Sequence, residues 1–234
     1  MRRLIAVATV LAASPGAMEH GVSAGASHGL VPQARAGSSP SVVQSFKATV
    51  SVIPPEIRTL MVGRSWHRGC PVAIKDLRLI RLRYWGFDRR AHWGRLVVRH
   101  GWGNRMATVF HRLYDARFPI RKVWLVDRFG GNDMRSMKAD NTSAFNCRWR
   151  AGQPGVWSEH AYGRAIDVNP LENPYVTPSH VSPPAGRRFL DRSMHRKGMI
   201  HKFDVAWRAF RRIGWKWGIW PPVYDYQHFS STGQ

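Results

Sequence analysis

Alternating apolar and basic side chains mark the clearest regular element of this chain. From Leu77 to Tyr84 the sequence reads Leu-Arg-Leu-Ile-Arg-Leu-Arg-Tyr, which is typical of a strand with one buried face. Short apolar runs at residues 96–98 and 123–126 predict two further strands.

Helical spacing appears in two other segments. Residues 104–116 carry apolar side chains three and four positions apart, with Asn104 as the predicted N-cap. The apolar positions are Met106, Val109, Phe110, Leu113 and Tyr114. Residues 203–213 predict a second helix, ended by Gly214. Because helices and short strands are mixed without regular alternation, we expect an α+β fold.

The N-terminal segment has a different character. Met1-Arg2-Arg3 precedes a ten-residue apolar run that ends at Ala13, a pattern that predicts a signal peptide and is too short to span a bilayer. We expect a signal peptide over residues 1–26, a flexible linker over 27–50 and one folded domain over 51–234. A misassigned start codon with a disordered leader is the alternative. No later stretch is apolar enough for a transmembrane helix.

The charge is extreme, at +22 formally with a pI near 11.5. Such a field attracts polyanions, which include nucleic acid, anionic lipid and acidic cell-wall polymers. The basic residues are dispersed, as on a solvated surface, and no nucleic-acid-binding signature is visible, so specific nucleic-acid binding is not expected. Cys70 and Cys147 could form a disulfide in an exported protein. If they are reduced, we expect Cys147 to be a buried thiol.

Candidate chemistry is concentrated in two motifs. One is the segment Ser158-Glu-His160-Ala-Tyr-Gly-Arg-Ala-Ile-Asp167, and the other is Asp225-Tyr-Gln-His228. Two imidazoles and a carboxylate suit zinc, whose catalytic sites keep a fourth position open for water. Asp225 and His228 could face one centre from a turn or a single helical turn. Taken singly, each of these side chains could equally be structural.

The full pattern S-x-H-x-x-G-x-A-x-D followed by D-x-x-H resembles the zinc D-alanyl-D-alanine carboxypeptidases of the VanY and VanX type. Those enzymes share their fold with phage L-alanyl-D-glutamate endolysins and the hedgehog signalling domain. The resemblance implies a small antiparallel sheet flanked by helices. It also implies one Zn²⁺ held by His160, Asp167 and His228, with Asp225 as the catalytic general base.

The resemblance implies further site residues, for which the sequence pattern is less specific. Arg148, upstream of the first ligand, is the candidate for binding substrate or stabilising the oxyanion, and a surface role is the alternative. Ser158 is a candidate substrate contact or a structural turn residue. Where relatives often carry paired acids, this chain has Asn132-Asp133 before Met-Arg-Ser-Met. The histidines between the motifs rank below His228 as ligands; they are His180, His195 and His201.

The function implied is that of an exported zinc metallopeptidase, secreted or in the cell envelope, and we expect it to act as a monomer. It would cut peptidoglycan stem peptides at a D-amino-acid-containing bond, by Asp225-assisted attack of zinc-bound water. Peptidoglycan peptides and anionic wall polymers are the partners expected. The alternatives are an L-alanyl-D-glutamate-type endopeptidase, a non-catalytic wall-binding module and a basic nucleic-acid-binding protein.

Overall fold

A three-stranded antiparallel sheet forms the first part of the described chain. The computed structural model describes residues 45–234, so the predicted signal peptide and most of the predicted linker lie outside the described residues. The strands follow the order β1-β2-β3. Their bounds are β1 (Ala48–Val52), β2 (Leu77–Trp85) and β3 (Ala91–Arg99). Regular structure therefore begins inside the 27–50 segment, and β2 confirms the strand expected from residue 77.

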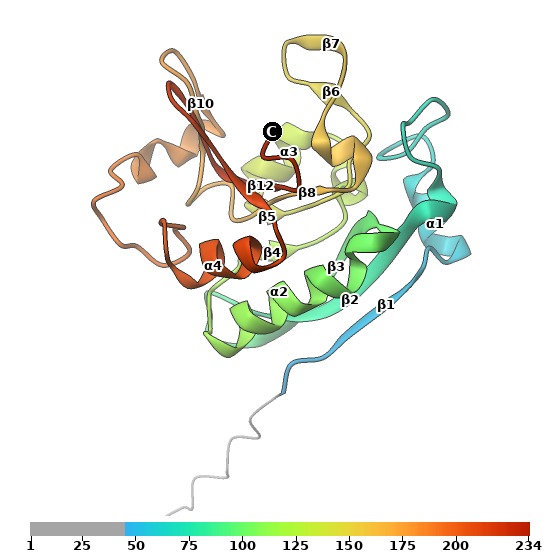
Figure 1. The fold of residues 1–234 in the computed structure, drawn as a ribbon, viewed down its shortest axis with the longest axis horizontal. Coiled ribbons are helices and arrows are strands. Elements are labelled where there is room, and N and C mark those ends of the chain that lie inside the picture. Colours follow the sequence, from blue (N-terminus) through green and yellow to red (C-terminus); the bar gives the residue numbers. More distant parts are fainter. Residues whose placement is uncertain (1–44) are drawn as a thin grey trace, which may run out of the picture. The chain divides into compact units, whose positions relative to one another are not determined.

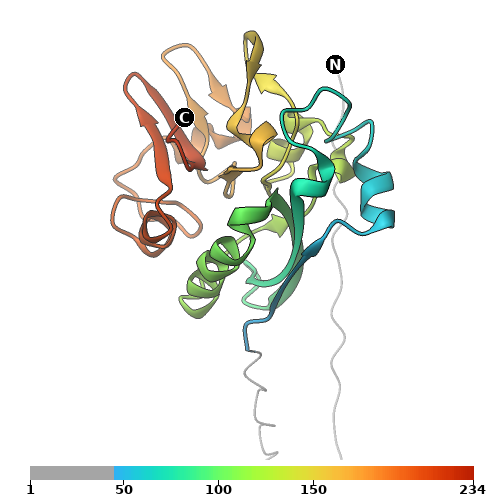
Figure 2. The same cartoon turned by 45° about the vertical axis from the view of Figure 1, so that its right-hand side comes forward.

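Helix α2 (Gly103–Asp115) covers one face of this sheet (Figures 1 and 2). Its apolar side packs on the even-numbered residues of β2 and β3. These are Ile80, Leu82, Tyr84, Leu96 and Val98. The helix begins after the 3-10 turn η2 (His100–Trp102), so Trp102 rather than Asn104 occupies the cap position, and no side chain caps it.

The opposite face is covered at one end only. Helix α1 (Pro55–Met61) and the 3-10 turn η1 (Ile74–Asp76) lie there over a second apolar cluster, which includes Leu77, Leu79 and Val97. At the other end of this face the side chains of β2 and β3 remain exposed.

Short elements connect this sheet to the C-terminal part. They are β4 (Lys122–Val123), η3 (Val126–Phe129), α3 (Asp133–Lys138), β5 (Asn141–Thr142), β6 (Trp149–Arg150) and β7 (Gln153–Trp157). β4 pairs with β5 in parallel, and β6 with β7 in an antiparallel hairpin. The strand predicted over 123–126 therefore ends at Val123, because β5 offers only two residues for pairing.

A five-stranded sheet carries the C-terminal part, with β10-β9-β12-β11 in order and β8 also paired to β12. The elements are η4 (Glu159–Tyr162), β8 (Ala165–Asp167), β9 (Tyr175–Val176), β10 (Val181–Ser182), η5 (Pro184–Phe189), α4 (Val205–Arg212), β11 (Lys216–Trp220) and β12 (Val223–Ser230). The second predicted helix is present as α4, where the Asp204 side chain accepts a hydrogen bond from Trp207 N at 2.8 Å. The fold is thus mixed α and β, with several small sheets rather than one.

A buried acidic pair lies in the loops beside β5 and β8. Asp140 and Glu172 both approach Arg121, at 3.5 and 3.7 Å. Burial, and then the nearby charge of Asp140, raises the pKa of Glu172 to about 8. Arg121 does not offset this rise in pKa, because its side chain is 44% exposed and its contact with Glu172 is long.

Among residues 45–234, no helix has the length and apolar character that a membrane crossing requires.

Candidate metal centre

Three elements bring His160, Asp167 and His228 together. His160 lies in η4, Asp167 ends β8, and His228 lies on β12 directly opposite Asp167 in the antiparallel pairing. The main chain of Asp167 also exchanges hydrogen bonds with Ser143, at 2.9 and 3.1 Å. Side chains that are 61 and 68 positions apart in sequence therefore meet at one point.

The separations of their polar atoms match a tetrahedral ligand set. His160 Nε2 lies 3.2 Å from Asp167 Oδ2 and 3.3 Å from His228 Nδ1, while His228 Nδ1 lies 3.0 Å from Asp167 Oδ1. Two ligands at zinc-bond length on a tetrahedral ion lie about 3.3 Å apart. The three side chains are buried, at 4%, 4% and 7% exposure. These residues therefore fit a zinc ion in both chemistry and spacing.

Main-chain oxygens hold each imidazole by its other nitrogen. His160 Nδ1 lies 2.5 Å from the Ala144 carbonyl, and His228 Nε2 lies 3.0 Å from the main-chain oxygen of Gln234. An oxygen can only accept, so each of these nitrogens carries the proton. The lone pairs of His160 Nε2 and His228 Nδ1 then face the shared point, which is how metal-binding histidines are oriented.

Local backbone geometry explains why the first motif bends as it does. The Ser158 hydroxyl accepts a hydrogen bond from His160 N at 3.3 Å and so caps η4. Gly163 ends that turn with φ +64°, and a Cβ there would lie 2.6 Å from Arg99 N. Gly163 is therefore required both for the turn and for the close approach of β3.

Electrostatics at the centre favour a bound cation. Burial would raise the pKa of Asp167, but the charges and hydrogen bonds of His160 and His228 hold it well below its usual range. Burial opposes the charged form of His228, yet the hydrogen bond and charge of Asp167 raise its pKa to about 9. Without a metal, a proton on the imidazole thus supplies the positive charge that the buried carboxylate requires.

Asp225 faces the same region from β12, although it is three positions from His228. Both residues lie on a strand and not on a turn or helix, so the predicted local conformation is wrong. Trp217 pairs with Phe229 while the next residue, Gly218, pairs with Asp225, so three extra residues of β12 form a bulge. A Cβ built on Gly218 would lie 3.0 Å from the Cβ atoms of both Asp225 and His228. The bulge thus turns both side chains toward Gly218.

The Asp225 carboxyl is electrostatically unusual. Its Oδ1 is shielded from solvent and has no hydrogen-bond partner among residues 45–234. Burial, opposed by His228 and reinforced by the negative charge of Asp167, raises the pKa of Asp225 to about 7. A carboxyl group with such a pKa can accept and return a proton near neutral pH.

Arg148 lies in an ion pair. Its Nη2 is 2.8 Å from Asp133 Oδ2 at the start of α3, and its carbonyl accepts from Ser158 N at 3.1 Å. Its buried Nε has no partner in the described chain. Asn132, in the segment where relatives carry acids, caps α3 through its Oδ1. The ion pair therefore holds Arg148 next to the motif, and its buried Nε–H has no partner among residues 45–234.

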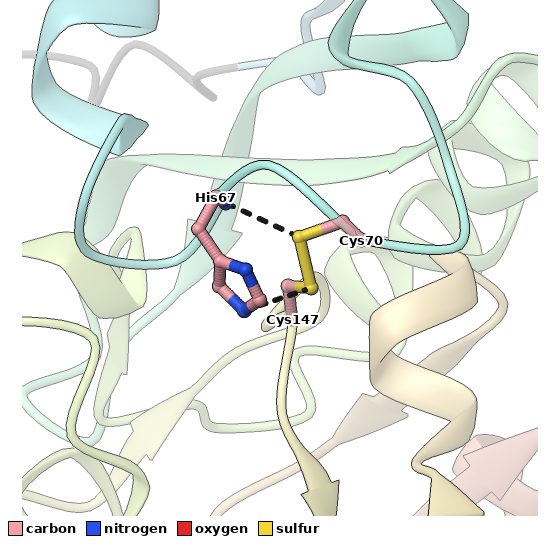
Figure 3. Close-up of side chains that lie close together, drawn as sticks. All are labelled: His67, Cys70 and Cys147. Atoms are coloured by element: carbon pink, nitrogen blue, oxygen red, sulfur yellow. Dashed lines mark hydrogen bonds between the residues drawn. A yellow bond between two sulfur atoms is a disulfide. The ribbon is translucent and has the colours of Figure 1, made fainter. Parts of the chain in front are cut away.

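The remaining histidines and cysteines lie elsewhere. His195 and His201 stack on each other at 4.2 Å between centroids and are not part of the metal centre. Cys70 and Cys147 form a disulfide, and His67 lies against it (Figure 3). The three could hold a metal by spacing alone. Because both sulfurs are bonded to each other, no thiolate is available there.

Three contributors to the site were not apparent from sequence. Gly218 permits the close approach of β11 to β12, and main-chain oxygens of Ala144 and Gln234 orient the imidazoles. Only Gly218 leaves a signal in the sequence, as a glycine between Trp217 and Ile219 inside a strand. Any residue type can supply a main-chain oxygen.

Comparison with known proteins gives a match to a peptidase family over part of the chain. Residues 151–231 match the model of a peptidase family described as D-alanyl-D-alanine carboxypeptidase. The matched segment contains His160, Asp167, Asp225 and His228, whereas Arg148 lies before it. No curated protein and no solved structure matches the chain. The similarity supports a hydrolase of the peptidase class.

Proposed function

We propose that this protein is an exported zinc metallopeptidase that hydrolyses peptidoglycan stem peptides at a D-amino-acid-containing bond. The observation that carries the proposal is the convergence of His160, Asp167 and His228 at tetrahedral ligand spacing, with Asp225 beside them. The family match over the same segment supports the carboxypeptidase-like reaction, and with it the hedgehog/DD-peptidase type of fold.

The residues have distinct tasks in this reaction. A zinc ion, when bound, would polarise the scissile carbonyl and acidify a water molecule. Asp225, whose Oδ1 has no hydrogen-bond partner among residues 45–234 and whose pKa is raised to about 7, accepts the proton of the attacking water and delivers it to the departing amine. The oxygens of Ala144 and Gln234 keep the imidazoles in the ligating tautomer throughout.

Arg148 is the proposed substrate-binding cation. A guanidinium can hold a peptide carboxylate with two hydrogen bonds or stabilise a developing oxyanion. Its ion pair with Asp133 orients it beside the motif. Ser158 caps η4 through its hydroxyl, which supports a structural role ahead of the substrate contact.

Export and attachment to the envelope are proposed on independent grounds. A disulfide between Cys70 and Cys147 fits an oxidising compartment. The charge of +22 would hold the protein near anionic wall polymers, where its substrate lies.

The decisive experiment uses metal-stripped and zinc-reloaded protein with defined muropeptides, read by mass spectrometry. We expect zinc-dependent release of terminal D-alanine. Asp225→Asn should bind zinc normally but lose at least about 100-fold in kcat, while Asp115→Asn, an exposed acid on α2, should behave as wild type. Absence of zinc binding, or full activity of Asp225→Asn, would refute the proposal.

Two alternatives give different results in the same experiment. Cleavage within the stem, without loss of terminal D-alanine, would identify an endopeptidase at the same centre. Zinc binding with no hydrolysis of any muropeptide would indicate a non-catalytic wall-binding module.

A further inference from the structure

We propose that the face of the β1-β2-β3 sheet opposite α2, at the end that α1 leaves uncovered, binds phosphate groups of a polyol-phosphate polymer. The site, called here the arginine pocket, consists of Arg81, Arg95, Arg128, Trp93 and Trp124. None of these residues belongs to the metal centre, so the inference does not rest on the proposed peptidase activity.

The arginine pocket is a cavity of about 280 Å³ on the face opposite α2. Arg81 alternates along β2 with Ile80 and Leu82, which are buried under that helix, so its side chain points to the other face. Trp93 and Arg95 occupy the same face from β3, and Val123 and Leu125 supply apolar lining.

Unbalanced positive charge is concentrated here. Arg81 and Arg95 are direct partners in the antiparallel pairing of β2 with β3. Like charges directly opposite one another destabilise a sheet. Arg128 adds a third guanidinium, and within residues 45–234 none of the three has a carboxylate at ion-pair distance. A bound anion between the strands would relieve this repulsion.

The guanidinium groups are already oriented. Arg81 lies 3.8 Å from the Trp93 ring centroid, and Arg128 lies 4.6 Å from that of Trp124. Stacking on an indole restricts a long side chain and leaves its N–H edge free. Such edges match the oxygens of phosphate, which arginine binds through two parallel hydrogen bonds.

The same stacking selects the kind of polymer. Proteins that bind single-stranded nucleic acid offer bare aromatic faces to the bases. Here the two indole rings are already occupied by cations. Arg81 and, at 5.3 Å, Arg83 lie over the Trp93 ring. Arg128 and, at 5.7 Å, Lys122 lie over the Trp124 ring. The site thus presents donors for phosphates and not platforms for bases, which favours a base-free polyol-phosphate chain.

Calorimetric titration with a synthetic glycerol-phosphate oligomer tests the site. The variant Arg81→Gln/Arg95→Gln/Arg128→Gln should bind about tenfold more weakly, and its affinity should depend less steeply on salt. The matched control removes three exposed arginines from η5 and α4 and should bind within about twofold of wild type. It is Arg187→Gln/Arg208→Gln/Arg212→Gln.

Two outcomes would overturn the proposal. Equal weakening in both triple variants would mean that the net charge alone binds the oligomer. Equal or tighter binding of an oligothymidylate with the same number of phosphates would mean that the site prefers nucleic acid.

A second variant guards against loss of the fold. Arg95→Glu replaces the like-charged pair with Arg81 by an ion pair, so we expect the melting temperature to rise by about 2 °C while the affinity for the oligomer falls about tenfold. A lower melting temperature, or unchanged binding, would contradict the repulsion from which the site is inferred.

Discussion

Replacing Gly218 by alanine should separate metal-site geometry from overall stability. Gly218 lies on β11 against the bulge of β12, where its missing side chain leaves room for Asp225 and His228. The added methyl group would lie 2.9 Å from the Asp225 carbonyl oxygen and 3.0 Å from the Cβ atoms of Asp225 and His228.

The expected loss follows from these distances. Carbon atoms pack at about 3.5–4.0 Å, so both neighbours must move by about 0.5–1 Å. Catalytic groups tolerate only about 0.5 Å, and a displacement of 1 Å can cost about 100-fold. We therefore expect kcat/KM of Gly218→Ala to fall by about 10- to 100-fold, which corresponds to about 1.4–2.7 kcal/mol. Overpacking should lower the free energy of unfolding by about 1–3 kcal/mol.

The assay compares stem-peptide hydrolysis, zinc affinity by chelator competition and urea unfolding. Gly101→Ala is the matched control, because a Cβ at Gly101 meets nothing within 4 Å. It should leave all three quantities near wild type. If Gly218→Ala kept kcat/KM within twofold of wild type, the close contact at β12 would not govern the site.

Three other substitutions test separate features. Glu172→Gln should raise the free energy of unfolding by about 1–3 kcal/mol at pH 9 and little at pH 4. The reason is that burial and a neighbouring carboxylate raise the pKa of Glu172 in the folded protein to about 8 from its ordinary value of 4.5. The stability present at low pH is therefore lost as the pH rises from 4.5 through 8, where the buried carboxyl must ionise. Urea titrations at both pH values measure the difference. Removing the disulfide with Cys70→Ser/Cys147→Ser should cost about 2–4 kcal/mol, because it closes a loop of 77 positions, and a reductant should then have no further effect on unfolding. Arg148→Lys should raise KM for the stem peptide about tenfold with little change in the urea midpoint, whereas an unchanged KM would leave Arg148 only its ion pair.

Local periodicity predicted the elements whose own side chains determine them. β2 and α2 were expected nearly at their observed bounds, because each has one apolar face buried against the other. The strand expected over 123–126 is shorter, since its length depends on how much of β5 lies beside it. The prediction of Asn104 as the N-cap of α2 was wrong, because the preceding 3-10 turn shifts the start of the helix.

The candidate site was predictable in composition but not in conformation. The two motifs named the side chains that the structure brings together. The sequence does not reveal that Asp225 and His228 lie on a bulged strand, because the bulge is a matter of register with β11. The roles of Ala144 and Gln234 depend on main-chain oxygens, which leave no mark in residue types.

The bulge of β12 has an evolutionary consequence. Side chains alternate along a regular strand, so residues three positions apart face opposite ways; the odd number of extra residues is what lets Asp225 and His228 face the same way. A change in β11 that restored regular pairing at this spacing would turn one of the two side chains outward and leave β8 and η4 untouched. Sequence drift in β11 alone can therefore silence the pair while the motif itself stays intact.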